Sequence, residues 1–163
     1  MYQDDPRQPH HTWTHTPGSH PGFAGPSPSA DYSPAPFTVD IEAATLQNDT
    51  YRTALWTGAH LQLTLMSIDP GADIGLEVHP HLDQFIRVEA GQGMVLMGDG
   101  PNNLFHRQPV ADATAFIIPA GYWHNLVNTG GQALKLYSIY APPQHPPGTV
   151  HLTRAEADAA EHH

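Results

Sequence analysis

The sequence predicts an all-β protein, a barrel or sandwich of short strands, and two observations lead to this fold class. Seventeen Pro and 14 Gly in 163 residues are too many for a helical bundle of this length. Between them lie short runs rich in Val, Ile, Thr, Tyr and Phe, several of which alternate apolar and polar residues as half-buried strands do. A chain of 163 residues has room for one ordinary domain.

Residues 1–36 form the first segment, which we expect to be a disordered arm. The segment is rich in Pro, Gly, Ser, His and Thr and has almost no aliphatic residues. It therefore cannot bury enough apolar surface to offset the entropy that folding would cost. The predicted barrel accordingly spans residues 37–152.

The barrel region contains nine strand-like runs. Alternation is clearest in the run from Leu61 and in the run from Leu134, and turn-forming clusters such as Asp69-Pro70-Gly71 separate neighbouring runs. The runs lie around Leu55, from Leu61, from Ile74, from Gln84, from Gly93, near Phe105, from Thr114, from His124 and from Ala133.

Residues 153–163 form the last segment, a short C-terminal helix and tail. Thr153 and Glu156 have the spacing of a capping box, and an Ala-rich stretch follows them. We expect this helix to end near Glu161 and to have no functional role.

Composition excludes several classes of function. Six Lys plus Arg against 16 Asp plus Glu give a formal charge of -10, so we expect no nucleic-acid partner. The sequence has neither a basic segment followed by an apolar one at its N-terminus nor an apolar run of about 18 residues, which predicts a cytoplasmic protein without membrane association. There is no Cys, whereas the thirteen His are candidate metal ligands.

Two clusters of candidate ligands stand out. In the first, Glu77, His79 and His81 alternate along one strand face. With a rise of about 3.3 Å per residue, Glu77 and His81 lie ~13 Å apart, too far for both to bind one ion at ~2 Å. In the second, a turn at Pro119 leads His124 into a strand, from which it could meet the first cluster across the barrel. The alternative is that the His side chains only form hydrogen bonds in a polar barrel mouth.

The two clusters resemble the two cupin motifs, Gly-x5-His-x-His-x4-Glu-x6-Gly and Gly-x5-Pro-x-Gly-x2-His-x3-Asn. Three positions differ: Glu77 replaces the first His, Gln84 replaces Glu, and Ala113 replaces the first Gly of the second motif. The resemblance spans roughly residues 37–152 and implies a double-stranded β-helix, the jelly-roll barrel of cupins. The positions in register are Gly71, His79, Gly91, Pro119, Gly121, His124 and Asn128.

A narrower resemblance links the chain to a bacterial group of single-domain cupins often labelled mannose-6-phosphate isomerase-like. It is carried by the stretches IGLEVHPHLDQFIRVEAGQG, PAGYWHN and APPQHPPGTVH.

The cupin resemblance implies one divalent transition-metal ion held by Glu77, His79, Gln84 and His124. His81 is then excluded, and we expect it at a solvent-facing rim rather than in proton transfer. Gln84 could instead orient a metal-bound water. Two imidazoles and a carboxylate suit Fe, Mn, Zn, Ni or Co and leave coordination positions open.

A metal with open positions predicts a small-molecule metalloenzyme, isomerase-like or dioxygenase-like, for which we assign no catalytic residue and no substrate. The alternative is a non-catalytic module that binds a small ligand or metal, or a structural coat-type module. Near strand-like segments of the barrel the only cations are Arg52, Arg87 and Lys135, with Arg107 in a loop-like stretch. A phosphate pocket, and with it a literal sugar-phosphate isomerase, is therefore poorly supported. Exposed strand edges predict a homodimer.

Overall fold

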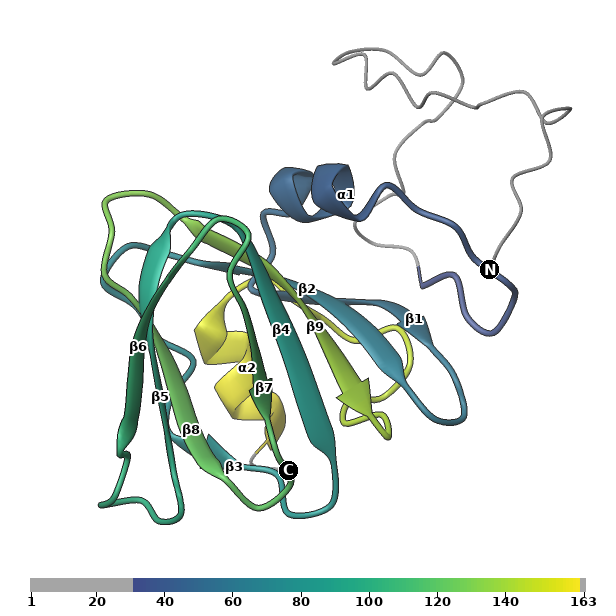
Figure 1. Ribbon diagram of the computed structural model, residues 1–163. Helices are drawn as coiled ribbons and strands as arrows, with labels where there is room; N and C mark the ends of the chain where they lie inside the picture. Colours follow the sequence, from purple (N-terminus) through teal and green to yellow (C-terminus); the bar gives the residue numbers. More distant parts are fainter. Residues whose placement is uncertain (1–30, 162–163) are drawn as a thin grey trace, which may run out of the picture.

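The computed structural model describes residues 31–161, which form two antiparallel sheets around one core (Figure 1). The sheets confirm the predicted all-β jelly-roll barrel. The larger sheet has the strand order β10 (Val150–His151), β1 (Arg52–Thr57), β2 (Gln62–Ile68), β9 (Leu134–Ala141), β4 (Asp83–Ala90) and β7 (Ala115–Ile118). The smaller sheet has the order β3 (Glu77–Val78), β8 (Trp123–Asn128), β5 (Gln92–Gly98) and β6 (His106–Ala111).

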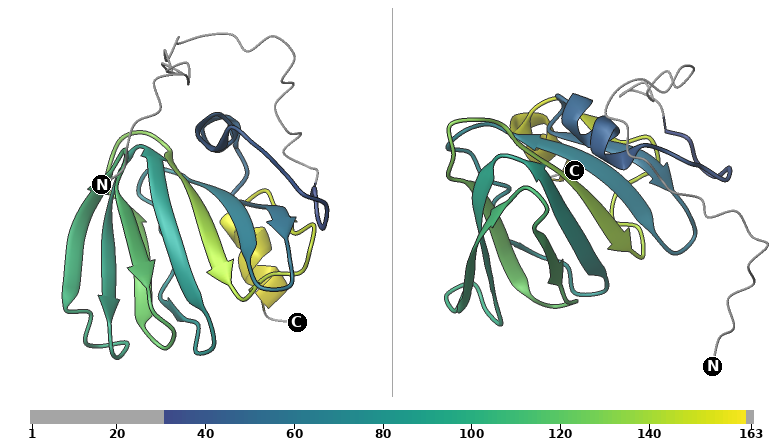
Figure 2. Two further views of the ribbon diagram at one scale, coloured as in Figure 1. Left: turned by 45° about the vertical axis from the view of Figure 1, so that its right-hand side comes forward. Right: turned by 45° about the horizontal axis from the view of Figure 1, so that its top comes forward.

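Each of the strand-like runs overlaps one of the strands β1 to β9, but the pattern did not predict β10 or the helix α1 (Ile41–Gln47). The Asp40 carboxylate caps α1 by accepting a hydrogen bond from Ala43 N at 3.0 Å. The helix lies on the outer face of the larger sheet, where Ala44 packs in a cluster with Leu55 and Leu65 (Figure 2). With seven residues, α1 is too short to show a clear helical period.

The inner face of the larger sheet changes from apolar to polar along the strands. Two cross-strand rows are apolar, and because directly paired residues face the same side of a sheet, they line the core together. These rows are Ile68 with Leu134, and Met66 with Leu136 and Val88. The next two rows introduce polar side chains: Thr64 with Ser138 and Ile86, then Gln62 with Tyr140 and Gln84. One end of the barrel therefore holds buried polar groups.

Residues 31–36, assigned by composition to the N-terminal arm, pack against β1 instead. Tyr32 N donates to the carbonyl of Leu55 at 3.0 Å, and Trp56 Nε1 donates to the carbonyl of Ala35 at 2.8 Å. The folded domain thus begins before residue 37. The rest of the predicted arm, residues 1–30, lies outside the described residues.

The helix α2 (Arg154–Glu161) confirms the predicted C-terminal helix. Glu156 N donates to Thr153 Oγ1 at 3.2 Å, as a capping box requires, while the Glu156 carboxylate accepts from Leu152 N at 2.7 Å. Ala157 is buried in the main core. Within residues 31–161, neither helix has the length and apolar character needed to cross a membrane.

Ala113 occupies a backbone conformation that suits glycine. It lies in the turn between β6 and β7 with φ of 66°, and it is the only non-glycine residue in the described chain with a positive φ. The corresponding cupin motif position is Gly, which adopts this conformation without the clash that a Cβ causes.

We predict that Ala113→Gly raises the free energy of unfolding by about 0.5–1 kcal/mol, because relief of the clash exceeds the entropy that Gly adds to the unfolded chain. Urea denaturation measures the change. Ala115→Gly, made two residues later in β7, is the control and should destabilise the protein. Equal losses in both variants would contradict the prediction.

Candidate metal centre

The pairing of β3 with β8 brings the two motif clusters together. Glu77 lies directly opposite His124 in the register of these strands, so both side chains point to the same face. The turn before β8 contains Gly121, whose φ of 83° favours glycine. Gly121 N donates to the carbonyl of His79 at 2.9 Å, so this turn also holds the backbone of His79, the third candidate ligand.

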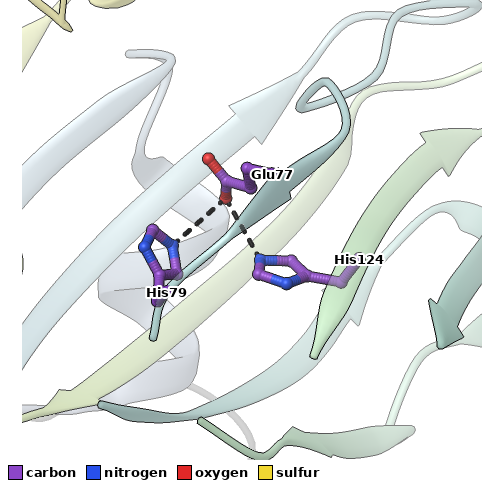
Figure 3. A group of neighbouring side chains, drawn as sticks. All are labelled: Glu77, His79 and His124. Atoms are coloured by element: carbon purple, nitrogen blue, oxygen red, sulfur yellow. Dashed lines mark hydrogen bonds and ion pairs between the residues drawn. The ribbon is translucent and has the colours of Figure 1, made fainter. Parts of the chain in front are cut away.

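The three side chains converge on one point (Figure 3). Glu77 Oε1 lies 3.3 Å from His124 Nε2 and 3.4 Å from His79 Nε2. One candidate ligand atom from each residue lies within 4.8 Å of the others. Ligands bound to one ion at about 2.1 Å are roughly 3.0–3.5 Å apart when adjacent, which matches the two measured distances.

A hydrogen bond to the backbone determines the tautomer of His124. Its Nδ1 lies 3.0 Å from the carbonyl oxygen of Tyr122, which can only accept, so Nδ1 must carry a proton and donate it. In the neutral imidazole, Nε2 is then an acceptor whose lone pair faces Glu77. Two acceptors 3.3 Å apart repel each other unless a proton or a metal ion lies between them.

The burial of these side chains makes an unpaired polar atom among them more unfavourable. The His124 side chain is 1% exposed, the His79 side chain 11% and the Glu77 side chain 22%, so the cluster reaches solvent mainly at Glu77. His79 Nε2 is itself buried and has no hydrogen-bond partner. Burial by itself would raise the pKa of Glu77, but its contacts with His124 and His79 lower that pKa to about 2. Glu77 is therefore a carboxylate at neutral pH.

Gln84 and His81, the other two residues considered as ligands, differ from each other in their surroundings. Gln84 is buried on β4, where its Nε2 donates to Ser138 Oγ at 2.8 Å and its Oε1 has no hydrogen-bond partner. The free atom of this amide is thus the oxygen, the atom able to bind a metal. His81 is exposed and lies outside the three-residue cluster.

Three residues near the cluster were not singled out as functional by the sequence: Tyr140, His145 and Arg52. The Tyr140 ring lies 6.0 Å from the His79 ring and 5.1 Å from the His145 ring, measured between centroids. Gln62 holds the His145 backbone from both sides, donating to its carbonyl at 2.8 Å and accepting from its N–H at 2.9 Å. The inward register of Tyr140 and Arg52 was the only sequence signal, whereas His145 lies in a loop that only the tertiary structure brings inward.

Comparisons with known proteins agree with this fold. A family model of the cupin domain matches residues 64–140. The chain is 60% identical over 131 residues to the uncharacterized protein YrkC of Bacillus subtilis (strain 168), an alignment that covers 80% of this chain and 70% of YrkC. The chain belongs to the cupin family.

Two further relatives extend the comparison. This cupin is 38% identical over 122 residues to the uncharacterized protein L612 of Acanthamoeba polyphaga mimivirus, with 74% of each chain covered. The crystal structure of BH2720 from Bacillus halodurans matches it with a TM-score of 0.79 and 62% identity, over 79% of this chain and 98% of that one. These relatives confirm the cupin family and fold, and their names carry no activity.

His145 generates a pH prediction. Burial, followed by the charge of Arg52, lowers the pKa of His145 to about 3, with Glu77 opposing the shift and His79 and His151 adding to it. The unfolded chain, with an ordinary imidazole pKa near 6.5, therefore binds more protons than the folded one between about pH 6.5 and pH 3. This difference makes the free energy of unfolding fall as the pH is lowered.

We expect His145→Asn to reduce the loss of stability between pH 7 and pH 5 by about 1–2 kcal/mol. Urea denaturation of the metal-free protein at the two pH values measures the loss. His60→Asn, at an exposed position, is the matched control and should retain the wild-type slope. If both variants keep that slope, His145 is not the group responsible.

Proposed function

We propose that this cupin binds one divalent transition-metal ion through Glu77, His79 and His124, with Gln84 as a fourth ligand, and that the ion serves a small-molecule metalloenzyme. The observation that supports the metal is the pair of short distances from one carboxylate oxygen to two imidazole nitrogens. A single divalent ion satisfies all three ligand atoms at once. Gln84 is the proposed fourth ligand because its buried Oε1 has no hydrogen-bond partner.

Hydrogen bonding without a metal explains the cluster less well. A proton on His124 Nε2 satisfies its pairing with Glu77 Oε1, but His79 Nε2 lies at a long 3.4 Å from the same oxygen and has no hydrogen-bond partner. Because the Nδ1 proton of His124 already faces the Tyr122 carbonyl, donation from its Nε2 to Glu77 requires a charged imidazolium, which is costly in a site of low exposure. The metal therefore accounts for more of the geometry with fewer unpaired groups.

The site also suits binding of a small molecule. At most four protein ligands leave positions open on an octahedral ion, and the exposed part of Glu77 indicates the side from which solvent reaches the cluster. When bound, such an ion polarises a carbonyl or enediol oxygen, and a redox-active ion supports oxygenase chemistry. The buried side chains of Ile86, Phe116 and Ile118 are part of the apolar core that excludes water from the barrel.

Elemental analysis of the purified protein, combined with oxygen uptake in the presence of candidate substrates, separates the possible activities. Iron with substrate-dependent uptake supports the dioxygenase-like reaction. Zinc, manganese, nickel or cobalt without uptake supports the isomerase-like reaction if a substrate is converted, and the non-catalytic module if it is only bound. A protein that holds no divalent metal after saturation and dialysis contradicts the proposal.

We predict that His79→Ala and His124→Ala each weaken metal binding by at least about 100-fold, since even residues that only support a ligand contribute 10–100-fold. Competition with a chelating dye measures the affinity. His81→Ala is the matched control and should bind metal as the wild type does. The ligand assignment is wrong if His81→Ala empties the site while Glu77→Ala leaves it filled.

The homodimer and the cytoplasmic location stay predictions. Two of the four edge strands favour a dimer, since among residues 31–161 β7 pairs only with β4 and exposes Ile117, while β6 pairs only with β5. Sedimentation equilibrium at micromolar concentration should show two chains per particle. A strict monomer would contradict this prediction.

A further inference from the structure

Arg52 is a buried cation inside the barrel that the metal centre does not use. It is 3% exposed and lies opposite Met66 in the pairing of β1 with β2. Met66 belongs to the main core, and directly paired residues face the same side, so Arg52 also points inward. Its guanidinium lies 5.3 Å from the centre of the Tyr51 ring, which is buried in the same core.

No acidic side chain in residues 31–161 forms an ion pair with Arg52. Three of the other four cations in this part of the chain have such partners: Arg87 with Glu89, Lys135 with Asp49, and Arg154 with Asp73. The fourth, Arg107, is exposed to solvent. Arg52 lies beside the Tyr140 hydroxyl and at a long 3.5 Å from His151 Nδ1, while its Nε has no hydrogen-bond partner. The Glu77 carboxylate acts on Arg52 only from beyond ion-pair distance, and it also faces the two imidazoles. A buried guanidinium without an ion pair of its own is unfavourable, which favours a further anion beside it.

A chain of polar contacts connects Arg52 with the metal centre. The Tyr140 hydroxyl contacts both Arg52 and Ser138, and Ser138 Oγ accepts from Gln84 Nε2. The same Tyr140 ring packs against His79. Two further polar atoms beside this chain are buried and unpaired, Thr64 Oγ1 and His145 Nε2. Unpaired polar atoms gathered at one end of an otherwise apolar core indicate that a polar ligand binds there.

We propose that Arg52 and Tyr140 form an anion subsite that holds the carboxylate of a short hydroxy or oxo acid, while a second oxygen of the acid faces the metal centre. This inference rests on the proposed metal site. The charge of a divalent ion and Arg52 together exceeds the single negative charge of Glu77, which favours an anionic ligand.

The donor set selects a carboxylate over a phosphate. One planar guanidinium matches the two oxygens of a carboxylate, whereas a phosphate dianion requires more positive charge than Arg52 alone supplies. Because the Tyr140 side chain is close to both Arg52 and the ligand His79, we expect the acid to have few carbon atoms.

The test compares glycolate and pyruvate with their uncharged amides, using the full chain loaded with cobalt. Calorimetry and the visible cobalt spectrum report binding, and cobalt content per chain is measured separately. We expect the wild type to bind at least one of the acids at least about tenfold more tightly than its amide. In Arg52→Gln this preference is lost while the cobalt content is unchanged. Arg87→Gln, which removes a half-exposed cation, is the control and keeps the preference.

The outcomes separate the two proposals. Loss of cobalt from the wild type contradicts the metal site alone, and the titrations are then repeated on the metal-free chain, where an Arg52-dependent preference for the acids still supports the anion subsite. Equal binding of acid and amide by the wild type overturns the subsite, as does an unchanged preference in Arg52→Gln. Tighter binding of inorganic phosphate than of either acid overturns the carboxylate assignment.

A purely structural role for Arg52 makes a different forecast. If Arg52 only holds Tyr140, Arg52→Gln lowers the unfolding midpoint and leaves the preference for acids intact. The anion subsite predicts the reverse, because removal of an unpaired buried charge does not lower the midpoint of the ligand-free protein. Tyr140→Phe keeps the ring packing and removes the hydroxyl, so it provides a second variant with a weakened preference if Arg52→Gln does not fold.

Discussion

The close approach of one carboxylate oxygen to two imidazole nitrogens is the interaction on which the polar end of this barrel depends. Glu77 and His124 are paired across β3 and β8, and the backbone carbonyl of Tyr122 holds the His124 ring in place. The backbone pairing fixes where the two side chains start, and the hydrogen bond to Tyr122 fixes the orientation of the His124 ring. Because the acceptors are fixed before any ion arrives, the barrel creates a local need for positive charge.

Apolar burial on the rest of the inner face offsets the destabilising effect of this polar site. Side chains such as Val88, Leu134 and Leu136 are completely buried, and apolar burial stabilises the fold by about 25 cal/mol for each Å² removed from water. Polar groups follow two and four residues after Leu136 on the same strand, at Ser138 and Tyr140 of β9. The apolar end of each strand thus stabilises the fold, whereas the polar end carries the site residues. The same hydrogen-bonded sheet connects the two ends.

The sequence allowed prediction of whatever depends on neighbours along the chain. Alternation within a strand located the strands, and the motif spacing selected Glu77, His79 and His124, which the fold does bring together. Contacts across the barrel were out of reach, because strands distant in sequence meet only through the strand order of the sheets. For this reason the unpaired charge of Arg52 could be seen in the sequence only as one of a few scattered cations, and the loop of His145 only as a Pro-rich stretch. Likewise α1 is explained by the apolar outer face that it covers, which no local period reveals.

Several buried polar groups at this end of the barrel do not stabilise the unliganded fold. Replacing a buried ion with an apolar side chain of similar volume is often neutral or stabilising, and Met66 beside Arg52 shows that this row accepts such a side chain. A barrel shaped for stability alone would therefore have an apolar residue at position 52 and would not leave Gln84 Oε1, Thr64 Oγ1 and His145 Nε2 unpaired. Thr64 lies in the row next to Tyr140, and His145 packs against the Tyr140 ring, so the proposed metal ion and a small anionic ligand would together provide partners for these groups. The unpaired groups thus destabilise the ligand-free fold, but they already stand in the arrangement that the bound state requires.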